Sequence, residues 1–231
     1  MAQSQFRWWI LGGCLLLLCA VAQPGHAQSP HDAHADSLRG LAHAAAGPGE
    51  ASDRWLELSR HYRKRNLDST QACLDRATRM ARQAGDRDRQ QRCNMSQAAL
   101  KWMLGDLAAA ESRYRQAVAY WQGKNDTLEV ARCLLNLGTV CQGAHKDQQA
   151  ATYLKTALRL AQAAEQQLIA AQAAGSIATV SFQMGQPDSI RKYSEVAKQG
   201  FLSLNDSANL ARVHHNLGFY YLELGMSSEA R

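Results

Sequence analysis

The feature that most constrains this fold is a set of residues that recur every forty positions. One column contains only alanine, at Ala77, Ala117, Ala157 and Ala197. A second column contains the pairs Gly85-Asp86, Asn125-Asp126, Glu165-Gln166 and Asn205-Asp206, and a third contains Gly105, His145, Gly185 and Gly225. Because three columns share one spacing, they indicate internal repeats of forty residues.

Each repeat has the pattern of two amphipathic helices. In the third repeat, one helical face is formed at spacings i, i+3, i+4 and i+7 by Leu134, Leu137, Gly138 and Cys141. After a break near residues 143–146, a second apolar stripe contains Ala150, Leu154, Ala157 and Leu158. Gly138 and Ala157 are small, so we expect the two helices to approach closely there. The composition also favours helix over strand, because Ala and Gln are abundant and there are only four prolines.

This pattern resembles the tetratricopeptide repeat, in which a large residue, Leu-Gly and Tyr mark the first helix, and Ala, an aromatic residue or Leu, and Ala mark the second. The fifth unit carries these features at Leu217, Gly218, Tyr221, Gly225 and Ala230. The resemblance covers about residues 50–231. It implies an all-α fold, a right-handed superhelical solenoid of helix–turn–helix repeats. The period is forty instead of about thirty-four, so we expect longer helices, and aligning the first two units requires a turn one residue shorter.

The N-terminal segment, residues 1–27, has the three-part pattern of a secretory signal peptide. A positive charge at Arg7 precedes the apolar run Trp8–Ala22, which is too short to span a bilayer as a helix. Small residues allow cleavage after Ala27, which we favour, or after Ala22; an uncleaved anchor is the remaining alternative. We therefore expect an exported protein that is periplasmic, or attached to the membrane and facing the periplasm.

Two further regions follow the signal peptide. Residues 28–50 are expected to form a leader with one short helix that Asp36 caps. The array occupies residues 51–231, with units at about 51–86, 87–126, 127–166, 167–206 and 207–231. The last unit stops inside its second helix, without the polar capping helix that solenoids usually have. From this we expect the chain to be the front part of a longer protein.

No catalytic motif occurs in the sequence. P-loop, GxSxG and HExxH motifs are absent, and the adjacent residues His214 and His215 are expected to point to different faces, His214 toward the core. The cysteines after the signal peptide lack metal-binding spacing, and we expect all four to be buried apolar residues: Cys73, Cys93, Cys133 and Cys141. The sequence predicts a chain that is not an enzyme and has no metal site or cofactor, although a kinase domain could follow it.

Positive charge is concentrated in residues 60–65 and 82–92 of a chain with a formal net charge of +6. Nucleic-acid binding is one interpretation, and a solvated face is the other. An exported protein rarely meets nucleic acid, so we expect no nucleic-acid partner. Binding to an acidic peptide or to an anionic membrane surface is left open as an alternative. Membrane attachment is expected only if the signal segment is retained or a transmembrane helix follows the chain.

The stronger candidate site is the concave groove that the resemblance implies, lined by the first helices of successive repeats. The expected partner-contacting residues are Arg132, Asn136, Thr139, Gln172, Thr179, Phe182, Arg212, His215, Asn216 and Phe219. Asparagine amides can pair with a peptide backbone, and arginine can hold a carboxylate. Alternatively, these side chains only solvate an inner helix surface. Gln172 and Ser176 interrupt the Arg-Asn pattern in the fourth unit.

Two functions fit these features. The first is a non-catalytic protein–protein interaction scaffold that binds a peptide or protein partner in the groove. The second is the input region of a membrane-bound signalling protein. It is suggested because the leader "DSLRGL", the first repeat and the Gly-Asp junctions resemble the front of bacterial histidine kinases and helix-turn-helix regulators. Protein binding is the expected activity of this chain under both of these functions.

Overall fold

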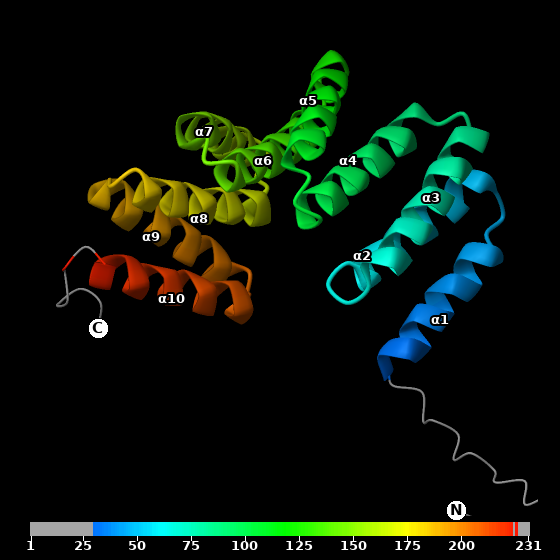
Figure 1. The fold of residues 1–231 in the computed structure, drawn as a ribbon, viewed down its shortest axis with the longest axis horizontal. Coiled ribbons are helices and arrows are strands. Elements are labelled where there is room, and N and C mark those ends of the chain that lie inside the picture. The colour runs from blue at the N-terminus through cyan, green and yellow to red at the C-terminus, as the bar shows by residue number, and fades with distance from the viewer. Residues whose placement is uncertain (1–29, 224, 226–231) are drawn as a thin grey trace, which may run out of the picture.

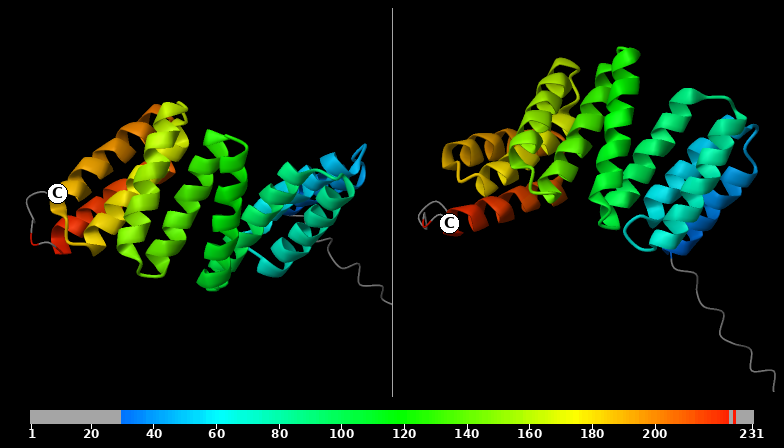
Figure 2. Two further views of the ribbon diagram at one scale, coloured as in Figure 1. Left: turned by 90° about the horizontal axis from the view of Figure 1, so that it is seen from above. Right: turned by 45° about the horizontal axis from the view of Figure 1, so that its top comes forward.

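The computed structural model describes residues 30–223 and Gly225, and this part of the chain is built from helices. The helices in chain order are α1 (Pro30–His43), α2 (Pro48–Tyr62), α3 (Leu67–Gln83), α4 (Arg87–Met103), α5 (Leu107–Gly123), α6 (Thr127–Gly143), α7 (Asp147–Ala163), α8 (Gln167–Gln183), α9 (Pro187–Ser203) and α10 (Ser207–Glu223). They bend into an arc with α1 and α10 at its two ends (Figure 1), and successive pairs lie side by side in one row (Figure 2). The expected all-α solenoid is confirmed. The expected signal peptide lies outside the described residues.

The forty-residue period follows from uniform helices and uniform connections. Each helix from α3 to α10 has 17 residues, and each connection between them has three. Two helices with two connections therefore repeat every forty residues. The α2–α3 connection, residues 63–66, has four residues, and the α4–α5 connection has three like the others. The shorter turn expected for the first two units is therefore wrong.

Each three-residue connection contains one residue in the left-handed conformation, at an interval of twenty residues. These residues are Gly85, Gly105, Asn125, His145, Glu165, Gly185 and Asn205, and Gly225 continues the series after the end of α10. At the α5–α6 connection the next amide, from Asp126, donates to the carbonyl of Trp121 at 3.1 Å, and the Asp126 carboxylate accepts from the amide of Glu129 at 3.0 Å. One residue thus completes the end of one helix and caps the start of the next. The second and third columns of residues that recur every forty positions in the sequence coincide with these turns.

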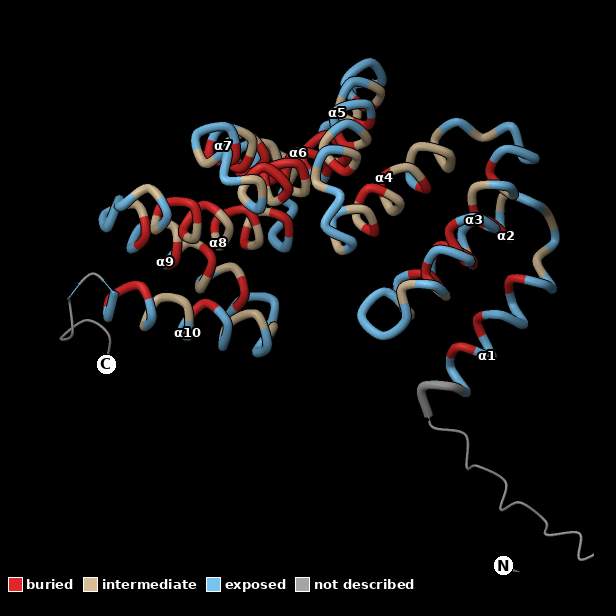
Figure 3. The backbone as a smooth tube through the Cα atoms, viewed as in Figure 1, coloured by how far each residue is buried: buried red, intermediate tan, exposed pale blue. Residues whose placement is uncertain are grey.

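The two helices of a repeat pack through small residues. The alanine column, Ala77, Ala117, Ala157 and Ala197, is fully buried at 0% exposure. In the third repeat Gly138 lies so close to α7 that an added Cβ would sit 2.6 Å from Cγ of Leu154. The apolar faces predicted for this repeat are buried, and Figure 3 shows buried residues gathered where α6, α7 and α8 pack together.

The leader helix α1 is longer than expected and packs against α2. It begins at Pro30, so Asp36 lies inside the helix and does not cap it; its carboxylate instead accepts from the Arg39 guanidinium at 2.7 Å. Three residues, Ala35, Leu38 and Ala42, are buried on one face of α1. Burying this face requires several helical turns, which explains the earlier start. Within residues 30–223, no helix combines the length and the apolar character that crossing a bilayer requires.

Candidate functional site

The first helices of the repeats form the concave side of the array, here called the inner surface: α2, α4, α6, α8 and α10. Consecutive first helices touch one another, in the pairs α2–α4, α4–α6, α6–α8 and α8–α10. Among the described residues, the second helices α3, α5, α7 and α9 do not touch one another. A row of hairpins whose first helices are closer together than its second helices must curve toward the first helices. The expected groove therefore lies on the expected helices.

A hollow of about 290 Å³ opens on the inner surface and spans three repeats. We call it the arginine hollow, because its polar lining consists mainly of Arg60 and Arg63 at the end of α2, Arg92 of α4, and Glu129, Arg132 and Asn136 of α6. The structure thus brings two predicted groove residues, Arg132 and Asn136, together with three arginines that the groove prediction omitted, although they belong to the basic segments noted in the sequence, residues 60–65 and 82–92. One signal was available: Arg92 lies forty residues before Arg132, in the column that continues as Gln172 and Arg212.

The charges of the arginine hollow are only partly paired. Glu129 sits in the first turn of α6 with a side chain that is 9% exposed. Nε of Arg92 is 3.7 Å from one of its carboxylate oxygens and Nε of Arg132 is 3.8 Å from the other. Both distances exceed those of hydrogen bonds. Oε2 of Glu129 is buried and accepts no hydrogen bond in the described part of the chain.

A second polar spot lies between α8 and α10. Arg212 and Asn216 line a small hollow there together with Tyr220. Arg212 donates to the side-chain oxygen of Asn209 at 2.8 Å, which holds its guanidinium near the start of α10. The two predicted Arg-Asn pairs therefore line separate hollows, with Gln172 of α8 between them in sequence.

Next to this spot, three aromatic rings form an aromatic patch, defined as Phe182, Phe219 and Tyr220. The rings of Phe182 and Tyr220 stack with centroids 4.6 Å apart, and Phe219 meets Phe182 edge-on at 5.8 Å. Tyr220 donates its hydroxyl proton to Thr179 at 2.9 Å, and burial raises its pKa. Phe219 remains 48% exposed. The patch offers an apolar contact that the Thr179–Tyr220 hydrogen bond holds in place.

The remaining predicted residues are less organised. The Thr139 hydroxyl donates to the carbonyl of Leu135 at 3.0 Å within its own helix. Gln172 is half-buried and forms no hydrogen bond to another described side chain, and His215 is exposed. His214 is also exposed, so its expected core position is wrong.

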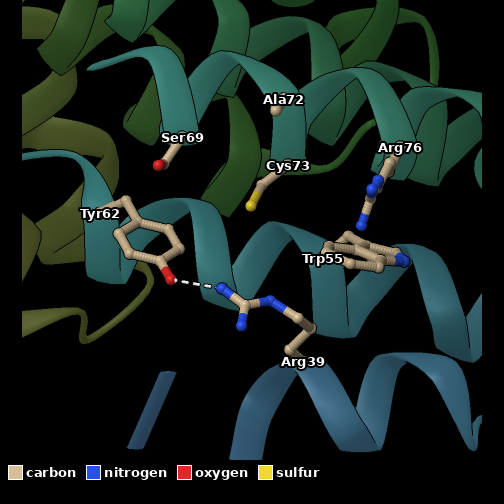
Figure 4. A pocket seen from close by; sticks show the side chains of 7 residues that line it. All are labelled: Arg39, Trp55, Tyr62, Ser69, Ala72, Cys73 and Arg76. Carbon is tan, nitrogen blue, oxygen red and sulfur yellow. Dashed lines mark hydrogen bonds between the residues drawn. The ribbon is translucent and has the colours of Figure 1, made fainter. Parts of the chain in front are cut away.

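The pocket between α1, α2 and α3 has a structural explanation (Figure 4). Arg39 of α1 donates to the Tyr62 hydroxyl at 2.8 Å, and Cζ of Arg76 lies 4.6 Å from the ring centroid of Trp55. The first contact attaches the leader helix to the first repeat, and the second joins α3 to α2 within that repeat. Cys73 lines the same pocket, and burial raises the pKa of its thiol, so it stays protonated at neutral pH.

The described residues contain no constellation suited to catalysis that we could identify. All four described cysteines are free and buried, as expected. Burial raises their thiol pKa values, for Cys133 to about 12, so none is a thiolate at neutral pH. In the same part of the chain, no group of three or more His, Cys, Asp or Glu side chains is placed to hold a metal ion. The inner surface offers charged and aromatic contacts, which suit recognition.

Comparison with known proteins supports this fold. Residues 91–163 match the tetratricopeptide repeat family, whereas no curated protein matches the chain by sequence. Among solved structures, BtubC (BKLC) from P. vanneervenii superposes with a TM-score of 0.69 at 18% identity, over 87% of this chain and 84% of that one. A signal transduction ATPase with numerous domains (STAND) from Pyrococcus horikoshii, with a tetratricopeptide repeat sensor, gives 0.66 at 13% identity, over 83% of this chain and 30% of that one.

A third similar structure is aspartyl phosphate phosphatase F from Bacillus subtilis. It has a TM-score of 0.65 and 14% identity, over 84% of this chain and 60% of that chain. At these identities the likeness concerns the fold alone. The chain therefore has the fold of a tetratricopeptide repeat solenoid and matches the repeat family itself over residues 91–163.

Proposed function

We propose that this chain is a non-catalytic interaction scaffold that binds an extended segment of a protein partner along its inner surface. The observation that carries the proposal is the arginine hollow, where three consecutive repeats present charged side chains that the fold leaves without full partners. Fold stability does not require such an arrangement, because surface charges contribute little to stability. A curved row of helices also presents many contacts to one elongated ligand.

The proposed partner segment crosses from the arginine hollow to the aromatic patch. Charged groups at the first end fix its orientation, and the exposed Phe219 ring at the other end contributes apolar contact. Gln172 lies on α8, between α6 of the arginine hollow and α10 of the aromatic patch, and its amide groups are available for a peptide backbone.

Charge reversal on the inner surface tests this proposal. In the variant Arg132→Glu/Arg212→Glu, both substituted side chains lie on the inner surface, and a control with Arg159→Glu/Arg191→Glu reverses two exposed charges on the second helices α7 and α9. We expect quantitative affinity capture from the native organism to lose the same partner with the first variant only. Equal capture by both variants, with helical circular dichroism unchanged, would reject the inner surface as the binding site.

A second candidate function is the sensor region of a signalling protein. It is favoured by the similar fold of a STAND protein that carries a tetratricopeptide repeat sensor. The test is the reading frame that follows the codon for Arg231. A transmembrane helix with a kinase or DNA-binding domain after it would support a sensor region, whereas a polar capping helix and a stop codon would support the scaffold alone.

We also propose that the protein is exported to the periplasm. The support is the signal-peptide pattern of residues 1–27. Mass spectrometry of the protein purified from its native organism should find Gln28 as the first residue. An intact N-terminus that fractionates with membranes would instead indicate a retained anchor, and an intact N-terminus in the soluble cell extract would contradict export.

A further inference from the structure

We infer that one edge of the array binds peripherally to an anionic phospholipid bilayer. This basic edge consists of the connections from a first helix to the second helix of the same repeat: residues 63–66, 104–106, 144–146 and 184–186. The opposite edge consists of the connections between repeats: residues 84–86, 124–126, 164–166 and 204–206. Bilayer binding at this edge and partner binding at the inner surface do not depend on each other.

The two edges carry opposite charge. The connections of the basic edge have a formal net charge of +3, from Arg63, Lys64, Arg65 and Lys146 against Asp106. Those of the opposite edge have a formal net charge of −3, from Asp86, Asp126, Glu165 and Asp206 against Lys124. An anionic surface therefore attracts one edge and repels the other, which orients the array.

The positive charge is concentrated at the ends of the first two repeats. Together with the helical turns that flank them, the α2–α3 and α4–α5 connections have a net charge of +3, from Arg60, Arg63, Lys64, Arg65 and Lys101 against Asp68 and Asp106. In the third and fourth repeats, Lys146 is opposed by Asp147 and Asp188. The contact with the bilayer is therefore expected at the first two repeats.

Helix capping explains acidic charges at the opposite edge. Asp86, Asp126 and Asp206 each accept an amide hydrogen bond from the helix that follows, at 2.9–3.0 Å.

The fold does not explain the basic charges in the same way. Arg63 and Lys64 form no hydrogen bond or ion pair with another side chain in the described part of the chain. Positive charge near the end of α2 interacts favourably with the helix dipole, but α6 and α8 have no basic residue in their last turns. Binding is therefore the better explanation for a cluster of basic residues at this place.

Two exposed apolar side chains lie at the same edge. Trp102, near the end of α4, is 42% exposed, and Leu104, which follows this helix, is 54% exposed. Arg63 and Ala99 line one hollow, which places the end of α2 beside the last turns of α4. Peripheral membrane binding combines basic residues with apolar side chains that enter the boundary of the acyl chains, and tryptophan is enriched at this interface.

The shape of the edge favours a bilayer over a peptide or a nucleic acid. Successive turns are separate ends of hairpins, and a flat surface can meet several of them at once. Single-stranded nucleic acids bind through a basic groove with aromatic rings on which bases stack, and Leu104 has no ring. Because no helix within residues 30–223 can cross a bilayer, the attachment that these residues provide is peripheral.

Vesicle flotation with the protein purified from its native organism tests the inference. One set of vesicles contains one part phosphatidylglycerol to two parts phosphatidylcholine, and the other contains phosphatidylcholine alone. We expect the protein to prefer the anionic vesicles at least about tenfold, because each basic residue near such a surface contributes about fivefold. The preference should decrease as salt is added. Equal affinity for both kinds of vesicle, or a preference that salt does not change, would overturn the inference.

Two charge variants locate the binding. Lys64→Gln/Arg65→Gln removes two charges from the α2–α3 connection and should lower the preference for anionic vesicles about fivefold or more. The control Lys155→Gln/Arg159→Gln removes two exposed charges from α7 and should lower it less than about twofold. All four side chains are exposed, so helical circular dichroism should not change. Equal decreases in the two variants would show non-specific attraction and contradict the basic edge.

Leu104 and Leu204 form a matched pair for photo-cross-linking. Each follows a helix of 17 residues and precedes a left-handed residue, but they lie on opposite edges. With a photo-reactive residue in place of one or the other, we expect irradiation on anionic vesicles to link lipid at position 104 and not at 204. Equal cross-linking at both positions, or cross-linking at 204 alone, would contradict the proposed orientation.

Competition distinguishes a bilayer from other sources of phosphate. Inorganic phosphate at matched ionic strength should not displace the protein from anionic vesicles, because it offers no acyl region to Leu104 and Trp102. Displacement by phosphate would replace the bilayer site with a site for a free anion, and displacement by a single-stranded oligonucleotide at equal phosphate concentration would assign the edge to nucleic acid. Either result would overturn bilayer binding and leave the scaffold function of the inner surface unaffected.

Discussion

The substitution Gly138→Ala should destabilise the array, although glycine is usually unfavourable inside a helix. Gly138 lies in α6 with α7 packed directly against it. An added Cβ would lie 2.6 Å from Cγ and 2.8 Å from Cδ2 of Leu154, and 3.3 Å from the carbonyl oxygen of Ala150. Leu154 is fully buried, so its side chain cannot swing out into solvent to make room for the added Cβ.

Two opposing effects set the magnitude. Alanine improves helix propensity over glycine by about 1 kcal/mol. Extra volume in a packed core costs about 1–3 kcal/mol. We therefore expect a net loss of up to about 2 kcal/mol. The matched control is Gly175→Ala in the interior of α8, where the nearest atom to an added Cβ is Cβ of Ala197 at 3.8 Å. That substitution should stabilise the protein by up to about 1 kcal/mol.

Urea denaturation followed by circular dichroism measures both changes. Solenoids unfold with nearest-neighbour cooperativity, so midpoints are compared only where the slopes of the transitions agree. A lower midpoint for Gly138→Ala with a higher one for Gly175→Ala is the expected result. If both substitutions stabilise the protein equally, the close approach of α6 and α7 at Gly138 is refuted.

Three further predictions concern the stability of the array. Glu165 has a left-handed φ of 55°, so Glu165→Gly should raise the free energy of unfolding by about 0.5–1 kcal/mol in urea denaturation, and a loss would contradict the strain. Ala157→Glu places a charge in a fully buried site and should lower the free energy of unfolding by about 3 kcal/mol or more. The control Lys155→Glu, on the exposed face of α7, should change it by no more than about 0.5 kcal/mol. Comparable losses for the two variants would refute the predicted packing. Hydrogen bonds from Lys146 and Arg115 lower the pKa of Glu111 in the folded protein. The Glu111 carboxylate therefore stabilises the fold at pH values above its unfolded-state pKa, and this contribution is lost as the pH falls through its lower folded-state pKa. Urea denaturation should show that Glu111→Gln costs up to about 1 kcal/mol at neutral pH and almost nothing near pH 3, and an equal cost at both would show that the carboxylate charge is irrelevant.

The repeated part of the fold could be predicted because local sequence determines it. Turn positions recur every twenty residues, and the residues around Gly138 and Ala157 show which helix faces meet. The start of α1 was missed, because its position depends on packing against α2. The α2–α3 turn was also missed, since this connection has four residues and lacks the left-handed residue that marks the others.

The candidate site could be predicted only in part. Arg132 and Asn136 were identified from their recurrence, and Arg92 belongs to the same column. Arg60 and Arg63 were not identifiable in this way, because the positions forty residues later, Leu100 and Met103, hold no arginine. The buried acceptor on Glu129 depends on how α4 and α6 pack, and no sequence pattern indicates it.

Site-specific photo-cross-linking in the native organism would test the partner-binding role of the inner surface most directly. One photo-reactive residue replaces Gln172, a half-buried position on α8 of the inner surface; in a second strain it replaces Lys155, which is exposed on α7. We predict that irradiation links a protein partner at position 172 and that the Arg132→Glu/Arg212→Glu substitutions remove this product. Cross-linking to the same partner at position 155 alone, or equally at both positions, would contradict binding by the inner surface.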